Sequence, residues 1–161
     1  MKIYEITTNQ FDYMDILLIG DEEEKMVNKY LKESTIFALY EGKILAAVCA
    51  VVETNSDTVE IKNFATYPEH RNKGYASALI DFVCDKYKNT FQYIILGTGE
   101  NEKTLNFYKK RGFVETHIIK NFFIDNYSHP IIENGKQLKD MIYLKKSITG
   151  YSKIWVSNYL V

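Results

Sequence analysis

The stretch EIKNFATYPEHRNKGYA, residues 60–76, decides the fold because it passes from a strand through a loop into a helix. An apolar strand comes first, a proline turn follows, and a basic, glycine-containing loop then begins the helix. A helix start presents unpaired N–H groups and the positive end of the helix dipole, and it binds phosphate most readily where glycine lets the backbone come close. Arg71 and Lys73 add positive charge beside Gly74. The stretch therefore predicts a binding site for a phosphorylated ligand.

The composition favours one folded domain. The chain has 161 residues, of which 46% are hydrophobic, and this is enough to bury a core. The formal net charge of −1 argues against a general nucleic-acid binder. The N-terminus, MKIYEITTNQ, lacks the apolar core of a signal peptide, and no apolar run approaches the roughly 18 residues of a membrane span. We therefore expect a cytoplasmic protein with neither a nucleic-acid nor a membrane partner.

The cysteines and histidines show no pattern of a disulfide or a metal site. Cys49 and Cys84 lie in apolar surroundings far apart in the sequence, which favours reduced thiols in the core. His70, His117 and His129 have no metal-ligand spacing with the cysteines. We expect no metal cofactor.

Strand and helix patterns follow one another in an order that defines the fold class. Helices are predicted over 75–87, in 11–32 with a break near Gly20, and over 102–111, where Asn101 is a good N-cap and Gly112 a C′ glycine. Strands are predicted over residues 2–8, 34–40, 44–53, 58–67, 91–96, 113–124 and 141–146. Antiparallel hairpins come first and strand–helix–strand units follow, which indicates an α/β (α+β) fold: a mixed sheet of six to seven strands with helices on both faces.

The end of the chain is a separate feature. Residues 1–146 are predicted to form the single domain, and residues 147–161 form an apolar extension. Because this extension holds Ile154, Trp155 and Tyr159, we expect it to dock on its own domain or on a second subunit. A homodimer is therefore an open alternative.

Two short motifs, in a set order, carry the functional signal. The first is Arg71-x-x-Gly74-x-Ala76, which follows a strand ending in Thr-Tyr-Pro. The second begins with Asn101 at a helix start and ends in Tyr108-x-x-x-Gly-Phe. Together they resemble the GNAT superfamily of acetyl-CoA-dependent N-acetyltransferases, of bacterial type. The resemblance covers most of the chain and is strongest over residues 60–113.

The resemblance implies acetyl-CoA as cosubstrate. Backbone N–H groups of residues 72–77 would hold its pyrophosphate, and the preceding strand would pair with the pantetheine arm. A bulge would splay that strand from the next one; the sequence does not show it, although Asn63 and Gly97 tolerate irregular backbone. The residues thus assigned to acetyl-CoA are Phe64, Ala65, Thr66, Arg71, Asn72, Lys73, Gly74, Tyr75, Ala76, Ser77, Asn101, Leu105 and Tyr108.

Tyr108 is the first predicted catalytic residue. By resemblance it points at the departing sulfur and acts as general acid. A phenol with a pKa near 10 is a weaker acid than a thiol with a pKa near 8.5, so Tyr108 is expected mainly to donate a hydrogen bond to the developing thiolate. The alternative is that Tyr108 only packs in the core.

Glu60 is the second predicted catalytic residue. It lies fourteen positions before Gly74, a spacing that resembles the catalytic glutamate of the histone-acetyltransferase branch. A base is needed because an alkylamine is protonated at pH 7. Glu53, Glu100 and a water-relayed base are alternatives, and Glu60 could instead be structural or merely attract a cationic substrate.

The amine acceptor is less defined than the cosubstrate. The acidic run 21–24 either stabilises a helix dipole or attracts a cationic amine. Tyr127 and His129 either contact the acceptor or shape a loop. We expect direct acetyl transfer in a ternary complex to a primary amine, either a small cationic amine or a peptide or protein amine. No cysteine lies within the two motifs, which disfavours an acetyl-cysteine route.

Two other functions are alternatives. A non-catalytic acyl-CoA sensor or scaffold would keep the phosphate loop but need neither Glu60 nor Tyr108. A dinucleotide-binding domain is disfavoured because the first glycines of Gly-x-Gly-x-x-Gly are missing and the chain begins with antiparallel strands.

Overall fold

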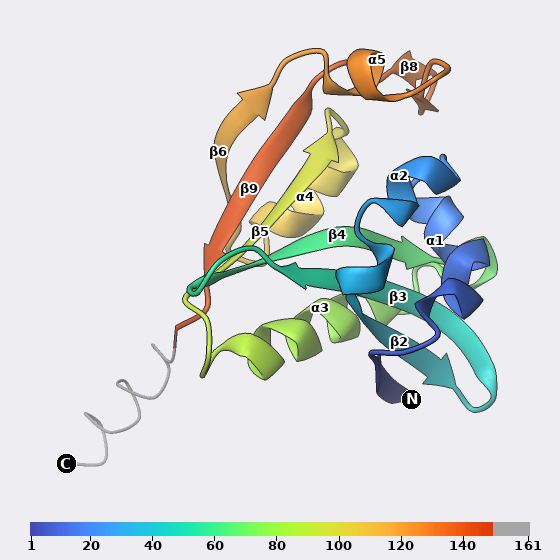
Figure 1. The fold of residues 1–161 in the computed structure, drawn as a ribbon, viewed down its shortest axis with the longest axis vertical. Coiled ribbons are helices and arrows are strands. Elements are labelled where there is room, and N and C mark those ends of the chain that lie inside the picture. The colour runs from blue at the N-terminus through green and yellow to red at the C-terminus, as the bar shows by residue number, and fades with distance from the viewer. Residues whose placement is uncertain (150–161) are drawn as a thin grey trace.

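A mixed sheet of seven strands forms the centre of the molecule (Figure 1). The structure, a computed structural model, describes residues 1–149. The spatial order of the strands is β1-β2-β3-β4-β5-β9-β6, and all neighbours are antiparallel except β4 and β5, which are parallel. The bounds are β1 Lys2–Ile6, β2 Thr35–Glu41, β3 Ile44–Glu53, β4 Thr58–Thr66, β5 Tyr93–Gly99, β6 Val114–Ile119 and β9 Met141–Ser147. The predicted fold class is confirmed.

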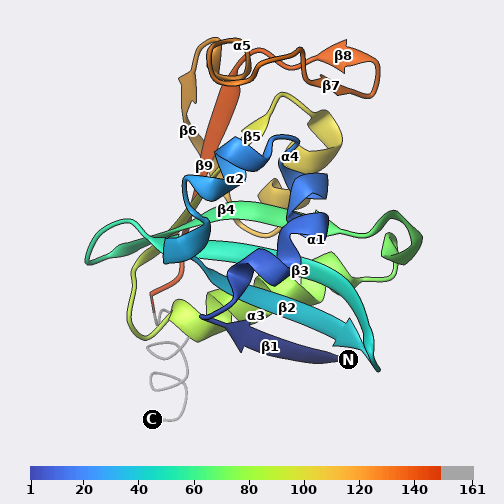
Figure 2. The same cartoon turned by 45° about the vertical axis from the view of Figure 1, so that its right-hand side comes forward.

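Helices cover both faces of this sheet, and each layer has its own apolar core. Figure 2 shows α1 in front of the sheet and α3 behind it. Ile16 and Val27 belong to the core under α1 and α2, whereas Leu79 and Leu105 belong to the core under α3 and α4. The α-helices on the sheet are α1 Met14–Gly20, α2 Glu24–Asn28, α3 Tyr75–Tyr87 and α4 Glu102–Lys109, and the 3₁₀ turns are Gln10–Tyr13, Leu31–Glu33 and Pro68–His70.

Local chemistry sets the ends of α4. The Asn101 side chain accepts hydrogen bonds from the N–H groups of Lys103 and Thr104, as an N-cap does. Gly112 adopts a φ of 89°, and the Phe113 N–H donates to the Tyr108 carbonyl oxygen, which closes the helix C-terminus. Both predicted caps are confirmed.

A bulge in β4 opens the sheet beside the second motif. Ala50 pairs with Asn63 and Val51 pairs with Ile61, so Lys62 has no partner residue in β3. The parallel pairing of β4 with β5 runs only as far as Ile61 and Leu96. Beyond this point the two strands diverge, as Figure 1 shows. The irregularity that the resemblance implied is therefore present, and it falls at Lys62.

The region after β6 differs from the prediction. Instead of one strand over 113–124, β6 ends at Ile119 and α5 follows at Phe122–Asn126. Asn121 causes the break, because it adopts a left-handed φ of 57° and its N–H donates to the Asp140 carboxylate. A small hairpin, β7 Ile132–Glu133 and β8 Lys136–Gln137, precedes β9.

Smaller differences concern element ends. β5 continues to Gly99, where a loop was expected, because Gly97–Gly99 keep pairing with β9. α4 ends at Lys109 rather than at residue 111. The extension predicted over 147–161 begins inside β9, and its residues from 150 onward lie outside the described part of the chain. None of the helices formed by residues 1–149 is long and apolar enough to cross a membrane.

Candidate active site

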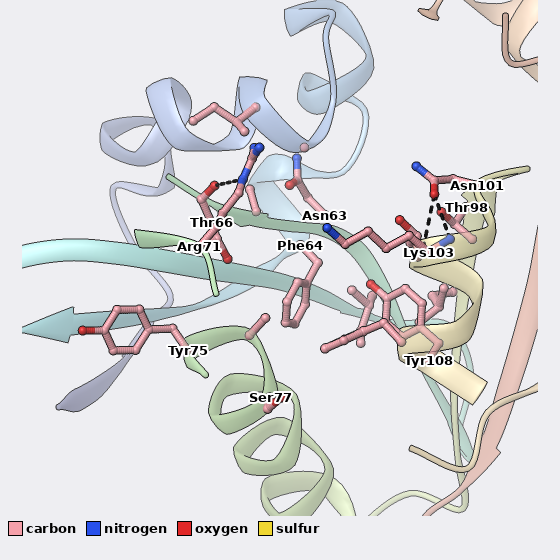
Figure 3. Close-up of a pocket in the computed structure, with 18 of the residues that line it drawn as sticks. Asn63, Phe64, Thr66, Arg71, Tyr75, Ser77, Thr98, Asn101, Lys103 and Tyr108 are labelled. Carbon is pink, nitrogen blue, oxygen red and sulfur yellow. Dashed lines mark hydrogen bonds between the residues drawn. The ribbon is translucent and has the colours of Figure 1, made fainter. Parts of the chain in front are cut away.

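A cavity of about 760 Å³ opens where β4 and β5 diverge. Its walls come from the end of α1, from β4, from the loop before α3 and the first turn of α3, from the end of β5, from α4 and from the turn between β7 and β8. Figure 3 shows Arg71 and Tyr75 on one side of this pocket, Asn101 and Tyr108 on the other, and Asn63 and Phe64 between them. The divergence of two parallel strands therefore brings the two sequence motifs to one cavity.

The loop before α3 has the backbone of an anion-binding site. Asn72 and Gly74 both adopt left-handed conformations, with φ of 60° and 83°. Gly74 is the N-cap of α3, and since it has no side chain it leaves the first N–H groups of the helix uncapped. A Cβ built on Gly74 meets no atom within 4 Å, so there is space beside the loop. The chain can therefore accommodate an anion at this helix start.

Most residues of this loop face the pocket. Arg71, whose Nε donates to the Thr66 carbonyl oxygen at 3.4 Å, lines the cavity together with Asn72, Gly74, Tyr75, Ala76 and Ser77. Lys73 is exposed and is not among the lining residues. The Lys73 ammonium therefore contributes charge near the opening of the cavity and does not contact its interior.

The diverging end of β4 offers free backbone groups. Phe64, Ala65 and Thr66 pair with β3 on one side and have no partner in β5 on the other. All three line the cavity. An extended ligand can therefore hydrogen-bond to this edge as an added strand would.

Tyr108 has a buried ring and a hydroxyl directed into the pocket. Its exposed fraction is 6%, and its ring packs edge-on against Phe64 at 6.5 Å and Phe113 at 5.5 Å between centroids. In Figure 3 the hydroxyl points toward Phe64. Burial raises the pKa of Tyr108 well above its ordinary value of 10, so the phenol stays protonated at neutral pH. Tyr108 can therefore donate a hydrogen bond but is a poor source of a full proton.

Asn101 and Leu105 have different positions. Asn101 lines the cavity, caps α4 and donates to the Glu133 carboxylate at 3.1 Å. Leu105 is buried in the core under α3 and α4 and is not a lining residue. Asn101 therefore lies at the pocket, whereas Leu105 lies in the core next to the pocket and does not line it.

Glu60 lies next to the pocket but does not line it. Its carboxylate, with 13% of the side chain exposed, accepts from the Lys62 ammonium at 2.9 Å and from the Tyr143 hydroxyl at 3.2 Å. Of the rivals, Glu53 pairs with Val59 at the other end of β4, and Glu100 pairs with Lys136 at 3.4 Å. Glu60 is therefore the nearest of the three to the divergence of β4 and β5.

Three basic residues of the pocket were not assigned from the sequence: Lys62, Lys103 and Arg111. Lys62 lines the cavity because the bulge places it there. The Arg111 guanidinium donates to the Ser77 hydroxyl and to the Phe107 carbonyl oxygen, and it stacks over the Phe107 ring at 3.9 Å. Arg111 belongs to the second motif, so its charge was a usable signal. Nothing local in the sequence marks Lys62.

The acidic run 21–24 holds a loop in place. The Tyr127 hydroxyl donates to the Asp21 carboxylate at 2.7 Å, and the Ser128 N–H and hydroxyl donate to the Glu23 carboxylate at 2.7 and 2.6 Å. The Ser128 hydroxyl is the main reason that the pKa of Glu23 falls to about 2. Neither Tyr127 nor His129 lines the cavity, so both fit the loop-shaping alternative.

The two cysteines are free and lie away from the cavity lining. Cys49 is fully buried in β3, and burial raises its pKa well above the ordinary value of a thiol. Cys84 is half-buried in α3. Cys49 lies in the core as predicted, whereas Cys84 is only partly buried, and Cys49 is a poor nucleophile in this environment.

Comparison with known proteins defines the class of the protein. Residues 2–113 match the Acetyltransferase (GNAT) family, which is more than half of the chain, so the chain belongs to this family. It is an N-acetyltransferase enzyme, as the sequence motifs predicted.

Three relatives illustrate this membership. The uncharacterised N-acetyltransferase YvbK of Bacillus subtilis (strain 168) is 33% identical over 132 residues, which cover 81% of this chain and 85% of YvbK. A GNAT family acetyltransferase from Elizabethkingia anophelis, solved with acetyl-CoA bound, has a TM-score of 0.85 at 32% identity, covering 91% of this chain and 97% of that one. A Bacillus subtilis acetyltransferase solved with CoA has a TM-score of 0.82 at 30% identity, with the same two coverages.

Proposed function

We propose that this N-acetyltransferase moves the acetyl group of acetyl-CoA directly to a primary amine in a ternary complex. One observation supports this most: a single cavity joins an uncapped helix start, a strand edge with free backbone groups and the Tyr108 hydroxyl. These are a phosphate site, a site for an extended arm and a hydrogen-bond donor for a leaving group.

For the cosubstrate, we assign the α3 start to the pyrophosphate. The N–H groups of residues 72–77 would hold it, and Arg71 and Arg111, which both line the cavity, would contribute positive charge. The free edge at Phe64–Thr66 would pair with the pantetheine arm. Lys73 would act from the mouth through its charge alone.

For the chemistry, we assign Tyr108 as the donor to the departing sulfur. Its raised pKa favours hydrogen bonding to a developing thiolate over complete proton transfer. Glu60 is assigned as the base for the amine. Because Lys62 lines the cavity and Glu60, its ion-pair partner, does not, Glu60 would act through a water or through this ammonium.

For the acceptor, we propose a small cationic amine or a peptide or protein amine. The carboxylates of Glu22 and Glu133 line the cavity and would attract an alkylammonium group.

The test is calorimetric titration with acetyl-CoA of the wild type, Gly74→Asp and Gly42→Asp. Gly42 is the matched control, because it also has a positive φ and open space at its Cβ but lies in the hairpin between β2 and β3. We expect Gly74→Asp to weaken binding more than tenfold and Gly42→Asp to bind as the wild type does. Equal binding by all three proteins would overturn the phosphate assignment. Tight binding without turnover of any amine would favour the non-catalytic sensor.

A further inference from the structure

Lys62 is an amine of the protein inside the pocket proposed for acetyl transfer. It is the bulged residue of β4, directly after the last residue that pairs with β5. Its side chain is 32% exposed and lines the cavity that Tyr108 also lines. Its ammonium lies 5.9 Å from the centroid of the Tyr30 ring, a cation–π contact that holds it on the side of the sheet covered by α1 and α2.

A carboxylate stands next to this amine. The Lys62 ammonium lies 2.9 Å from the Glu60 Oε2 atom, which also accepts from the Tyr143 hydroxyl at 3.2 Å. A lysine must lose a proton before it can attack a carbonyl carbon. Glu60 is within hydrogen-bond distance of the proton that has to leave. Lys62 therefore has the two features required of an acceptor amine in this pocket, namely access and a neighbouring base.

We propose that Lys62 is a self-acetylation site, modified by the acetyl-CoA bound to the same molecule; this rests on the proposed function. Glu60 takes one proton from the ammonium, and the neutral Nζ then attacks the thioester carbonyl carbon. The C–S bond breaks and an Nζ–C amide bond forms. The thiolate takes the second proton lost by Nζ, and the first passes from Glu60 to water. The products are acetyl-Lys62, CoA and one proton.

The other basic residues of the pocket fit this role less well. Lys103 lines the same cavity, but among residues 1–149 its ammonium forms no ion pair with a carboxylate. The guanidinium groups of Arg71 and Arg111 stay protonated and are not nucleophiles at neutral pH. Lys62 is therefore the one lysine for which both pocket position and a paired carboxylate are seen in the described chain.

Acetylation would change the acceptor side of the pocket. The Lys62 charge would be lost, so the Glu60 carboxylate would keep only the Tyr143 hydroxyl as a partner. An incoming alkylammonium would then meet a carboxylate that no fixed cation neutralises. Self-acetylation would in this way convert the pocket to a form that binds cationic acceptors more tightly.

The test is peptide mass spectrometry of the full chain after incubation with acetyl-CoA. Lys25 is the internal control, because it also pairs with a glutamate, Glu23 at 3.3 Å, and is more exposed at 59%, but lies outside the cavity. We expect acetylation of Lys62 at least tenfold faster than of Lys25, at a rate independent of protein concentration. Glu60→Gln should slow it at least tenfold, and Lys62→Arg should abolish it while keeping the positive charge.

Four results would overturn the proposal. Equal rates at Lys62 and Lys25 would mean ordinary chemical acetylation. A rate constant for Lys62 acetylation that rises in proportion to protein concentration would mean transfer between molecules. Calorimetric binding of acetyl-CoA with no modification of Lys62 would reject self-acetylation and leave the proposed function standing. Absence of acetyl-CoA binding would reject both. Thermal unfolding of Lys62→Arg and Glu60→Gln would verify that both variants are folded.

Discussion

At the scale of single residues, Tyr108 shows how packing and chemistry are combined. Its ring fills the core between Phe64 and Phe113, and its hydroxyl reaches the cavity. Burial raises its pKa, which keeps the phenol protonated across the physiological range. The same burial makes full proton donation less favourable. A hydrogen bond to developing negative charge is the contribution that remains.

Tyr108→Phe is therefore expected to lower turnover roughly 10- to 100-fold, about 1.4–2.7 kcal/mol in the activation barrier. The ring packing is kept, so acetyl-CoA affinity and thermal stability should change little. The measurement is steady-state thiol release with a saturating amine, alongside calorimetry. Wild-type turnover in the variant would remove Tyr108 from the mechanism.

Gly20, at the end of α1, shows a tight packing requirement. A Cβ built there would clash with the Asn63 Oδ1 atom and would lie 3.3 Å from the Ala65 Cβ atom. Asn63 cannot easily move, because its amide donates to the Leu17 carbonyl oxygen at 2.8 Å and to the Tyr30 hydroxyl at 2.9 Å.

Gly20→Ala is expected to lower the free energy of unfolding by about 1–3 kcal/mol, as overpacking does. Chemical denaturation measures it. The control is a double-mutant cycle with Asn63→Ala. In that background Gly20→Ala should lower the free energy of unfolding by less, because the Asn63 side chain that the added methyl group would contact is absent. An unchanged cost in that background would assign the effect to another cause.

At the scale of elements, the start of α2 is tied to the loop after α5. The acidic run was predicted either to stabilise a helix dipole or to attract a cationic amine; the structure adds a third role, because the Glu23 carboxylate accepts two hydrogen bonds from Ser128. Residue 23 and residue 128 are far apart in the sequence, and no local pattern could have paired them. Because the pKa of Glu23 is lowered, its ionised form stabilises the fold.

Glu23 should therefore make stability depend on acid pH. Its contribution is complete above the unfolded pKa of about 4.5 and is lost as the pH falls toward the folded pKa of about 2. Glu23→Gln should unfold at a lower temperature than the wild type at pH 6, and this difference should narrow as the pH falls to 3. The control is Glu24→Gln, at an exposed neighbour. A difference in unfolding temperature between Glu23→Gln and the wild type that does not change with pH would contradict this role.

Helices and strands could largely be predicted where the residues that determine them lie close together in the sequence. Alternating apolar residues, the Asn101 cap and the two glycine positions at 74 and 112 identified the strands and the ends of α3 and α4. The strand predicted over 113–124 was wrong because its apolar run continues past Asn121, whose left-handed backbone turns the chain into α5. The run by itself gave no sign of this turn.

At the scale of the whole molecule, the site exists because two strands that are parallel neighbours separate. The pairing of β4 with β5 ends at Ile61 and Leu96, and the cavity begins there. Both motifs reach it from different strands and helices. The sheet therefore does more than support the site, since its own irregularity creates the space.

The amino-acid sequence by itself determined the fold class, the GNAT family, the helix caps and the phosphate-loop backbone, because each depends on residues close together in the chain. Only the tertiary structure decided that Lys62 enters the pocket, that Glu60 lies beside it and that Leu105 lies behind it. These positions depend on the register of β3 against β4 and on where β4 leaves β5. Such pairings bring together residues far apart in the sequence, and their register is set by packing of the complete sheet.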